Sequence, residues 1–366
     1  MLNRRILRIK VMQALYALKQ SEVSNYHGGL EYFSDQFAPD LNSNEKQDLP
    51  KLEANKKLAS GHYEEYFLSG NKNYQDEAPE ITNVVDQAIS DYHKKTEKDK
   101  KHFGKLMLNE MDRISDLYLL LLRLPLDLYE FGEQQKNKGK SILADNQFLA
   151  LISSSKPLND HSGWDRGVLT TIYKLIKEDQ EFSELKSGSL EEDRKIITQI
   201  FKIVLKNKDL VSFFEEKDLN WAENRSIVKN LVLKTFKAVE EKDKMLNILE
   251  LSTNWEEDKQ FFKELYDKTI AGDKELEQIV TEKVRNWDIE RVAVLDRVIL
   301  KLAISEMIHF PSIPIKVTIN EYIELSKLYS TPKSKQFING ILDSASAELV
   351  KIGRIRKSGR GLIDNK

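Results

Sequence analysis

Basic residues open the chain at spacings suited to contacts with phosphate groups. The candidates on this predicted helix are Arg4, Arg5, Arg8, Lys10 and Gln13. On a helical wheel the three arginines and Lys19 share one sector of about 100°, which we expect to face solvent while Ile6, Leu7 and Ile9 dock the helix. Cations in the first turns oppose the helix dipole at about 0.3–1 kcal/mol each, and a bound anion reverses that sign. The pattern therefore predicts a phosphate-binding surface, and a solvated helix face is the alternative.

A second polar group lies near the end of the chain, beside an aromatic residue. Its members are Lys333, Lys335, Gln336, Phe337, Asn339 and Gly340. Recognition of a single strand combines phosphate contacts with stacking or hydrogen bonds to bases. We expect the lysines to meet phosphates, and Asn339 and Gly340 to permit a close approach of a nucleic-acid backbone. Phe337 is equally compatible with packing in the core.

Composition excludes several classes of protein. The 366 residues are 40% hydrophobic and 32% charged, and the net charge of -2 means that any nucleic-acid role depends on local patches. The chain has no cysteine, no two of its six histidines stand four residues apart, and no glycine-rich phosphate loop is present. We therefore expect no catalysis, no metal and no cofactor. The sequence also shows no secretion signal and no apolar run long enough to span a membrane, so we expect a cytoplasmic protein.

Helical periodicity dominates the chain, and the predicted fold class is all-α. The predicted loops are 21–29, 35–50, 69–79, 132–141, 153–163 and 186–189. We expect one core helix to end near Pro125, another to begin near Lys316, and a third to begin at Thr331 and Pro332. Asn220 and Asn254 are predicted helix N-caps.

Four short motifs, in order, resemble the NusB family of transcription antitermination factors. They are Ala14-Leu15-Tyr16 after the arginines, Asp296 to Ala303, Pro314 to Glu321, and Gln336 to Asp343. Gln336 replaces the basic residue that is more usual before Phe337. The resemblance implies two small helical bundles, binding to a boxA-like single-stranded element of nascent ribosomal RNA, and action with the ribosomal protein NusE in the RNA polymerase elongation complex. Tyr16, at the end of the predicted first helix, and Asp296, at the start of an otherwise apolar run, are the candidate contacts with a protein partner.

The domain layout departs from that family, because about 230 residues follow the first helix before the other motifs. We expect residues 1–22 to form the first helix of the NusB-like domain, 23–253 a helical insertion lobe, 254–350 the rest of the domain, and 351–366 a frayed basic tail. Two alternatives remain open. The insertion could carry the main activity of an interaction scaffold, or the chain could be an accessory domain related to ribosomal RNA methyltransferases.

Overall fold

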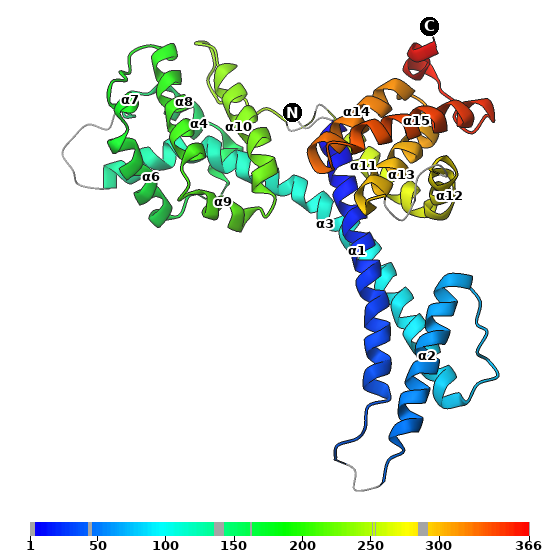
Figure 1. Ribbon diagram of the computed structural model, residues 1–366. Helices are drawn as coiled ribbons and strands as arrows, with labels where there is room; N and C mark the ends of the chain where they lie inside the picture. The colour runs from blue at the N-terminus through cyan, green and yellow to red at the C-terminus, as the bar shows by residue number, and fades with distance from the viewer. Residues whose placement is uncertain are drawn as a thin grey trace. The chain divides into compact units, whose positions relative to one another are not determined.

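Every regular element described in the computed structural model is helical (Figure 1), as the sequence predicts. The structure describes residues 4–42, 46–134, 143–161, 163–250, 252, 254–284 and 292–365. The chain forms two compact units. Unit 1 contains Met1–Arg4 and Leu108–Lys259, and unit 2 contains Arg5–Met107 and Gln260–Lys366. The segment expected to form one insertion, 23–253, is therefore distributed over both units.

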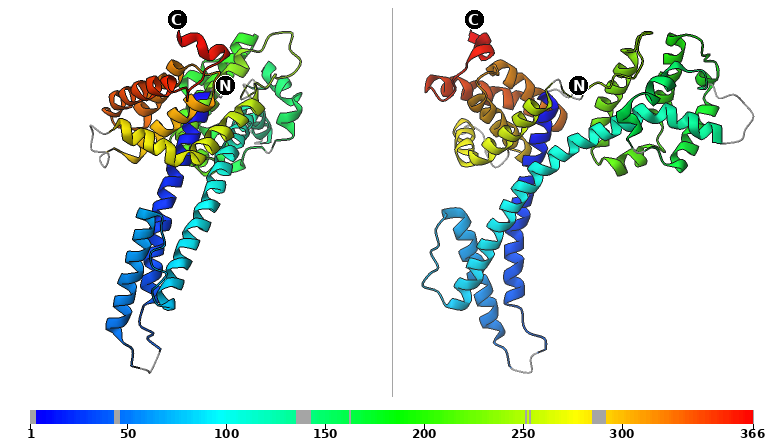
Figure 2. Two further views of the ribbon diagram at one scale, coloured as in Figure 1. Left: turned by 90° about the vertical axis from the view of Figure 1, so that its right-hand side faces the viewer. Right: turned by 180° about the vertical axis from the view of Figure 1, so that it is seen from behind.

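The first helix continues well beyond its expected end. Helix α1 spans Arg4–Gln36, so the loop predicted over 21–29 is wrong. Aromatic packing explains the continuation, because Phe33 is buried in a cluster with Tyr63 of α2 (Leu49–Ser69). Helix α3 (Pro79–Gln134) adds Ile81, Val85 and Ile89 to the same cluster. Figures 1 and 2 show α1, α2 and the first part of α3 side by side as a three-helix hairpin in unit 2.

Five further helices complete the packed part of unit 2. They are α11 (Trp255–Ala271), α12 (Asp273–Lys283), α13 (Val294–His309), α14 (Ile315–Tyr329) and α15 (Ser334–Lys351). The predicted apolar stripe of α13 is buried, including Ile299, Leu302 and Met307. Helix α14 begins one residue before the predicted Lys316. Helix α15 begins later than predicted, at Ser334, whose hydroxyl lies 2.9 Å from the hydroxyl of Thr331.

The basic tail is docked over its described residues, which corrects the expectation that it is frayed. Ile355 is buried, and Lys357 Nζ donates to the carbonyls of Met307 and Phe310 at 2.9 and 3.0 Å. These carbonyls end α13 and attract a cation because of the helix dipole. The chain ends in a short 3₁₀ helix, η2 (Gly359–Asn365).

Unit 1 packs shorter helices around the second part of α3. They are α4 (Gln147–Ser153), α5 (Lys156–Asn159), α6 (Arg166–Glu178), α7 (Gln180–Ser183), α8 (Leu190–Lys206), α9 (Val211–Lys217) and α10 (Trp221–Lys237). Trp221 stacks on Phe214 with ring centroids 4.3 Å apart. Helix α3 continues through Pro125, so the end predicted there is wrong. Burial of the neighbouring Leu124 and Leu126 compensates for the backbone hydrogen bond that proline removes.

The two predicted N-caps differ in outcome. Asn254 caps α11 as predicted, because its side chain accepts a hydrogen bond from the backbone of Glu257 at 3.2 Å. Asn220 makes no side-chain cap for α10. The neighbouring Asp218 instead accepts from the backbone nitrogen of Asn220 at 3.0 Å and from the side chain of Asn224 at 2.7 Å. Part of the loop predicted over 132–141 lies outside the described residues, which resume at Leu143.

Candidate nucleic-acid interface

Arg8 is buried, which corrects the expectation that it faces solvent and RNA. Its Nε and Nη2 donate to the two carboxylate oxygens of Glu306 in α13 at 2.7 and 2.8 Å, and its side chain is 4% exposed. Thr318 and Tyr322 of α14 donate to the same carboxylate at 2.9 and 3.0 Å. A guanidinium fork held in this way is fully engaged inside the bundle.

Two further basic residues of α1 also meet carboxylates of the chain. Arg5 makes two hydrogen bonds of 2.8 Å to Glu321 and remains 40% exposed. Lys19 pairs with Asp273 at 3.0 Å. The predicted solvent-facing sector is therefore turned toward acidic residues of α12, α13 and α14. A helical wheel cannot show these partners, because they lie more than 250 residues away in sequence.

Three more predicted RNA contacts on α1 have distinct surroundings. Arg4 pairs with Glu257 at 2.5 Å within unit 1 and is partly exposed. Lys10 is buried, which corrects its expected availability to RNA. Gln13 is half-buried. Of the predicted RNA contacts on α1 in unit 2, Arg5 therefore keeps a partly exposed side chain, with its guanidinium paired to Glu321.

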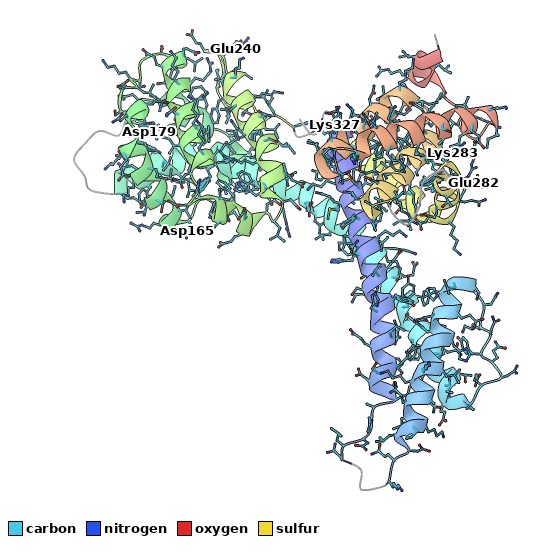
Figure 3. All side chains as sticks on the ribbon, in the orientation of Figure 1. Asp165, Asp179, Glu240, Glu282, Lys283 and Lys327 are labelled. Carbon is cyan, nitrogen blue, oxygen red and sulfur yellow. The ribbon has the colours of Figure 1, made fainter. Side chains whose placement is uncertain are left out.

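Helices α1, α14 and α15 bring several cations around Glu324. The hydrogen bond from Lys327 lowers the pKa of Glu324, and the positive charges of Arg5 and Lys335 lower that pKa further. Lys327, labelled in Figure 3, is a member of this group that the sequence analysis missed. Its position in the last turn of α14, just before the connection to Lys333 and Lys335, was the available signal. We call Arg5, Lys327, Lys333 and Lys335 the basic face.

The first turns of α15 present the remaining predicted RNA contacts. Lys333, Lys335 and Gln336 are exposed, whereas Phe337 is half-buried. The Asn339 side chain donates to Asp343 at 3.0 Å. Gly340 is exposed, and a Cβ added there would have open space around it. The packing of the fold therefore does not require glycine at this position.

Asp296 has a structural role inside the bundle, which corrects its assignment to a partner-binding surface. Its carboxylate accepts hydrogen bonds from Ser330 at 2.5 Å and from Ser334 at 2.6 Å, and the residue is buried. It thereby ties α13 to the connection between α14 and α15. Tyr16, the other predicted partner contact, is 39% exposed on α1.

A pocket of about 480 Å³ in unit 2 is lined by residues of α1, α3, α12 and α13. Lys301, almost buried, pairs there with Asp273 at 2.8 Å and with Glu277 at 2.6 Å. Burial raises the pKa of Asp273, but the charges of Lys19 and Lys301 outweigh it, and the net pKa is lowered. The pocket thus has paired charges of both signs.

Among the described residues, no group of three or more His, Asp or Glu side chains is arranged to hold a metal ion. No helix in the described part of the chain is long and apolar enough to cross a membrane.

Residues 226–347 match a protein family described as the NusB family. The chain carries a NusB family domain. The match begins inside α10 of unit 1, whereas α12–α15 and most of α11 belong to unit 2. Helix α1 lies outside the matched residues, yet it packs within the same unit as α13 and α14 through Arg5 and Arg8.

Named relatives cover part of the chain. The transcription antitermination protein NusB of Salinibacter ruber is 42% identical over 90 residues, which are 25% of this chain and 56% of that protein. NusB of Chloroherpeton thalassium is 42% identical over 91 residues, 25% of this chain and 43% of that protein. NusB of Oleidesulfovibrio alaskensis is 47% identical over 76 residues, 21% of this chain and 49% of that protein. The chain spans about half the length of these relatives, and no solved structure matches it.

Proposed function

We propose that the protein is an RNA-binding antitermination factor that uses the basic face to bind a boxA-like single-stranded element of nascent ribosomal RNA. It acts in the cytoplasm with NusE in the RNA polymerase elongation complex, and no catalytic step is involved. The exposure of Lys333 and Lys335 at the start of α15 is the observation that carries the proposal. The relatives named transcription antitermination protein NusB support the same class of function.

The chemistry of the basic face suits a single strand of RNA. Lys333 and Lys335 stand at the start of α15, where the positive end of the helix dipole also attracts phosphate. Half-buried Phe337, two residues after Lys335, offers an aromatic ring for contact with an unstacked base. Open space at Gly340, one turn further on, allows the RNA backbone to approach the helix closely.

Salt-dependent RNA binding by the full chain tests the proposal. We expect Lys333→Gln with Lys335→Gln to weaken binding of a boxA-like RNA several-fold and to reduce the log–log salt slope by about 1.4, since each lost phosphate contact on a single strand removes about 0.7. Fluorescence anisotropy at several salt concentrations gives both quantities, and a scrambled RNA of equal length measures sequence preference.

The matched control is Lys202→Gln with Lys229→Gln, two exposed lysines of unit 1. It removes the same charge without touching the basic face. An unchanged slope in the folded Lys333/Lys335 variant would contradict the assignment of the RNA surface.

Gly340→Ala gives a second, steric test. Alanine fits the fold, and replacing a helical glycine adds up to about 1 kcal/mol of helix stability. If RNA approaches α15 at this point, the same variant binds boxA-like RNA more weakly while its melting temperature is equal or higher. Unaltered RNA affinity would remove Gly340 from the interface.

A further inference from the structure

Helix α3 carries a line of lysines that the resemblance to NusB does not cover. The residues are Lys94, Lys98, Lys101 and Lys105, and all four are exposed. Their intervals of four, three and four residues place them on one face of the helix. The opposite face is packed: Thr96 and Met107 are buried, and Asp99 accepts hydrogen bonds from Ser21 and Asn25 of α1. We call the four residues the lysine stripe.

The lysine stripe has few ion pairs within the described part of the chain, although the hydrogen bond from Lys100 and the positive charge of Lys101 lower the pKa of Glu97. Lys98, Lys101 and Lys105 have no ion pair with a described carboxylate, and Lys94 reaches Asp91 only at 4.0 Å. Lysines three and four residues apart on a helix repel one another. The segment 93–105 holds six lysines against one aspartate and one glutamate, in a chain whose net charge is -2. An external anion would relieve this repulsion.

The shape and polarity of the lysine stripe select the kind of anion. It extends about 16 Å along the helix, at 1.5 Å per residue, and so offers evenly spaced cations to a linear polyanion. None of the exposed large apolar side chains in the described chain lies between Leu68 and Leu219. A membrane-binding helix needs an apolar face, and a protein interface needs apolar or aromatic anchors. The stripe has neither, which leaves a phosphodiester backbone as the best fit.

We infer that the lysine stripe binds the backbone phosphates of a single RNA strand as a second contact surface, separate from the basic face. The choice of RNA rests on the proposed function, whereas the anionic character of the ligand follows from the stripe alone. Contacts of this kind add affinity and salt dependence without base specificity.

The experiment compares two quadruple variants of the full chain. One changes the stripe, Lys94→Gln with Lys98→Gln, Lys101→Gln and Lys105→Gln. The control changes four exposed helical lysines elsewhere, Lys57→Gln with Lys195→Gln, Lys202→Gln and Lys229→Gln. Glutamine has nearly the helix propensity of lysine, and circular dichroism with thermal melting verifies that both variants fold.

The probe is an oligouridine of about 40 nucleotides, titrated at several salt concentrations. We expect the stripe variant to lose tenfold or more in affinity at low salt and to reduce the salt slope by about 2 to 3, from four contacts of about 0.7 each. We expect the control variant to show a much smaller change. An equal loss on an oligothymidine of the same length supports recognition through phosphate.

Two outcomes overturn the inference: equal slopes for the stripe and control variants, or stripe-dependent binding to phosphatidylglycerol vesicles with RNA binding unchanged. The proposed function fails separately. If the unaltered protein shows no preference for boxA-like over scrambled RNA, that proposal is contradicted, and the difference in slope between the two variants still decides the role of the stripe.

Discussion

Arg8 and Glu306 form a buried ion pair with two parallel hydrogen bonds, although 298 residues separate them in the chain. The pair joins α1 to α13, and the hydroxyl groups of Thr318 and Tyr322 complete the coordination of the carboxylate. It explains part of the positive charge at the start of the first helix. The anion that Arg8 requires is supplied by the protein itself.

Removing one partner of this pair is expected to be costly. Arg8→Ala leaves the Glu306 carboxylate buried beside only two hydroxyl donors, and breaking a buried ion pair costs about 3–5 kcal/mol. Arg5→Ala removes a half-exposed pair and should cost about 0–1 kcal/mol. Urea denaturation of both variants measures the difference. A loss of less than 1 kcal/mol for Arg8→Ala would show that the pair is not a stabilising feature of the bundle.

Helix α2 approaches α1 closely at Gly29 but leaves open space at Gly28. A Cβ at Gly29 would lie 2.5 Å from Cζ of buried Tyr63, whereas a Cβ at Gly28 has nothing within 4 Å. We expect Gly29→Ala to destabilise the protein by about 1–3 kcal/mol through overpacking. Gly28→Ala should be neutral or stabilising by up to about 1 kcal/mol. Thermal melting compares them, and equal melting temperatures would contradict the close approach.

Substitutions of Tyr16 and Asp296 should affect different properties: partner binding for Tyr16 and stability for Asp296. Asp296→Ala leaves the hydroxyls of Ser330 and Ser334 without their buried acceptor, and we expect a loss of about 1–3 kcal/mol in unfolding free energy. Tyr16→Ala alters a partly exposed side chain and should change stability little while weakening NusE binding. Calorimetric titration with NusE measures the affinity, and thermal melting measures the stability. Full NusE affinity in Tyr16→Ala would remove Tyr16 from the partner surface.

Acid should weaken the charge network around Lys301. Burial raises the pKa of Glu277, but the hydrogen bond and charge of Lys301 and the contact with Arg297 outweigh it, so the net pKa is lowered from its ordinary 4.5. A carboxyl group whose pKa is lower in the folded protein stabilises the fold above pH 4.5, and the effect is lost as pH falls through the folded value.

We therefore expect Glu277→Gln to lose about 1 kcal/mol at pH 7 and to show a flatter decline of stability below pH 4.5 than the unaltered protein. Glu282→Gln, on the same helix and labelled in Figure 3, is the control. Urea denaturation between pH 3 and 7 measures the slopes. If the unfolding free energies of Glu277→Gln and the unaltered protein fall in parallel below pH 4.5, the role of this network is contradicted.

Local sequence patterns correctly predicted the helices that have strong apolar periodicity and clear start or stop residues such as proline. The apolar stripe of α13 and the start of α14 after Pro314 follow from residues next to one another in the chain. The patterns failed where distant packing overrode a local signal. Glycines and polar residues over 21–29 indicated a loop, but packing of Tyr63 against Gly29 holds α1 as a helix there. Pro125 likewise fails to end α3, because its leucine neighbours are buried.

The sequence by itself determined the all-α class and the resemblance to NusB, because helical periodicity and short motifs are local properties. It also placed exposed cations at Lys333 and Lys335. Only the tertiary structure decided which basic residues remain available. Arg8 is buried against Glu306, whereas Lys333 and Lys335 stay exposed at the start of α15. The pairing of a charge depends on which distant side chains the fold brings within about 4 Å, and no wheel drawn on one helix contains that information.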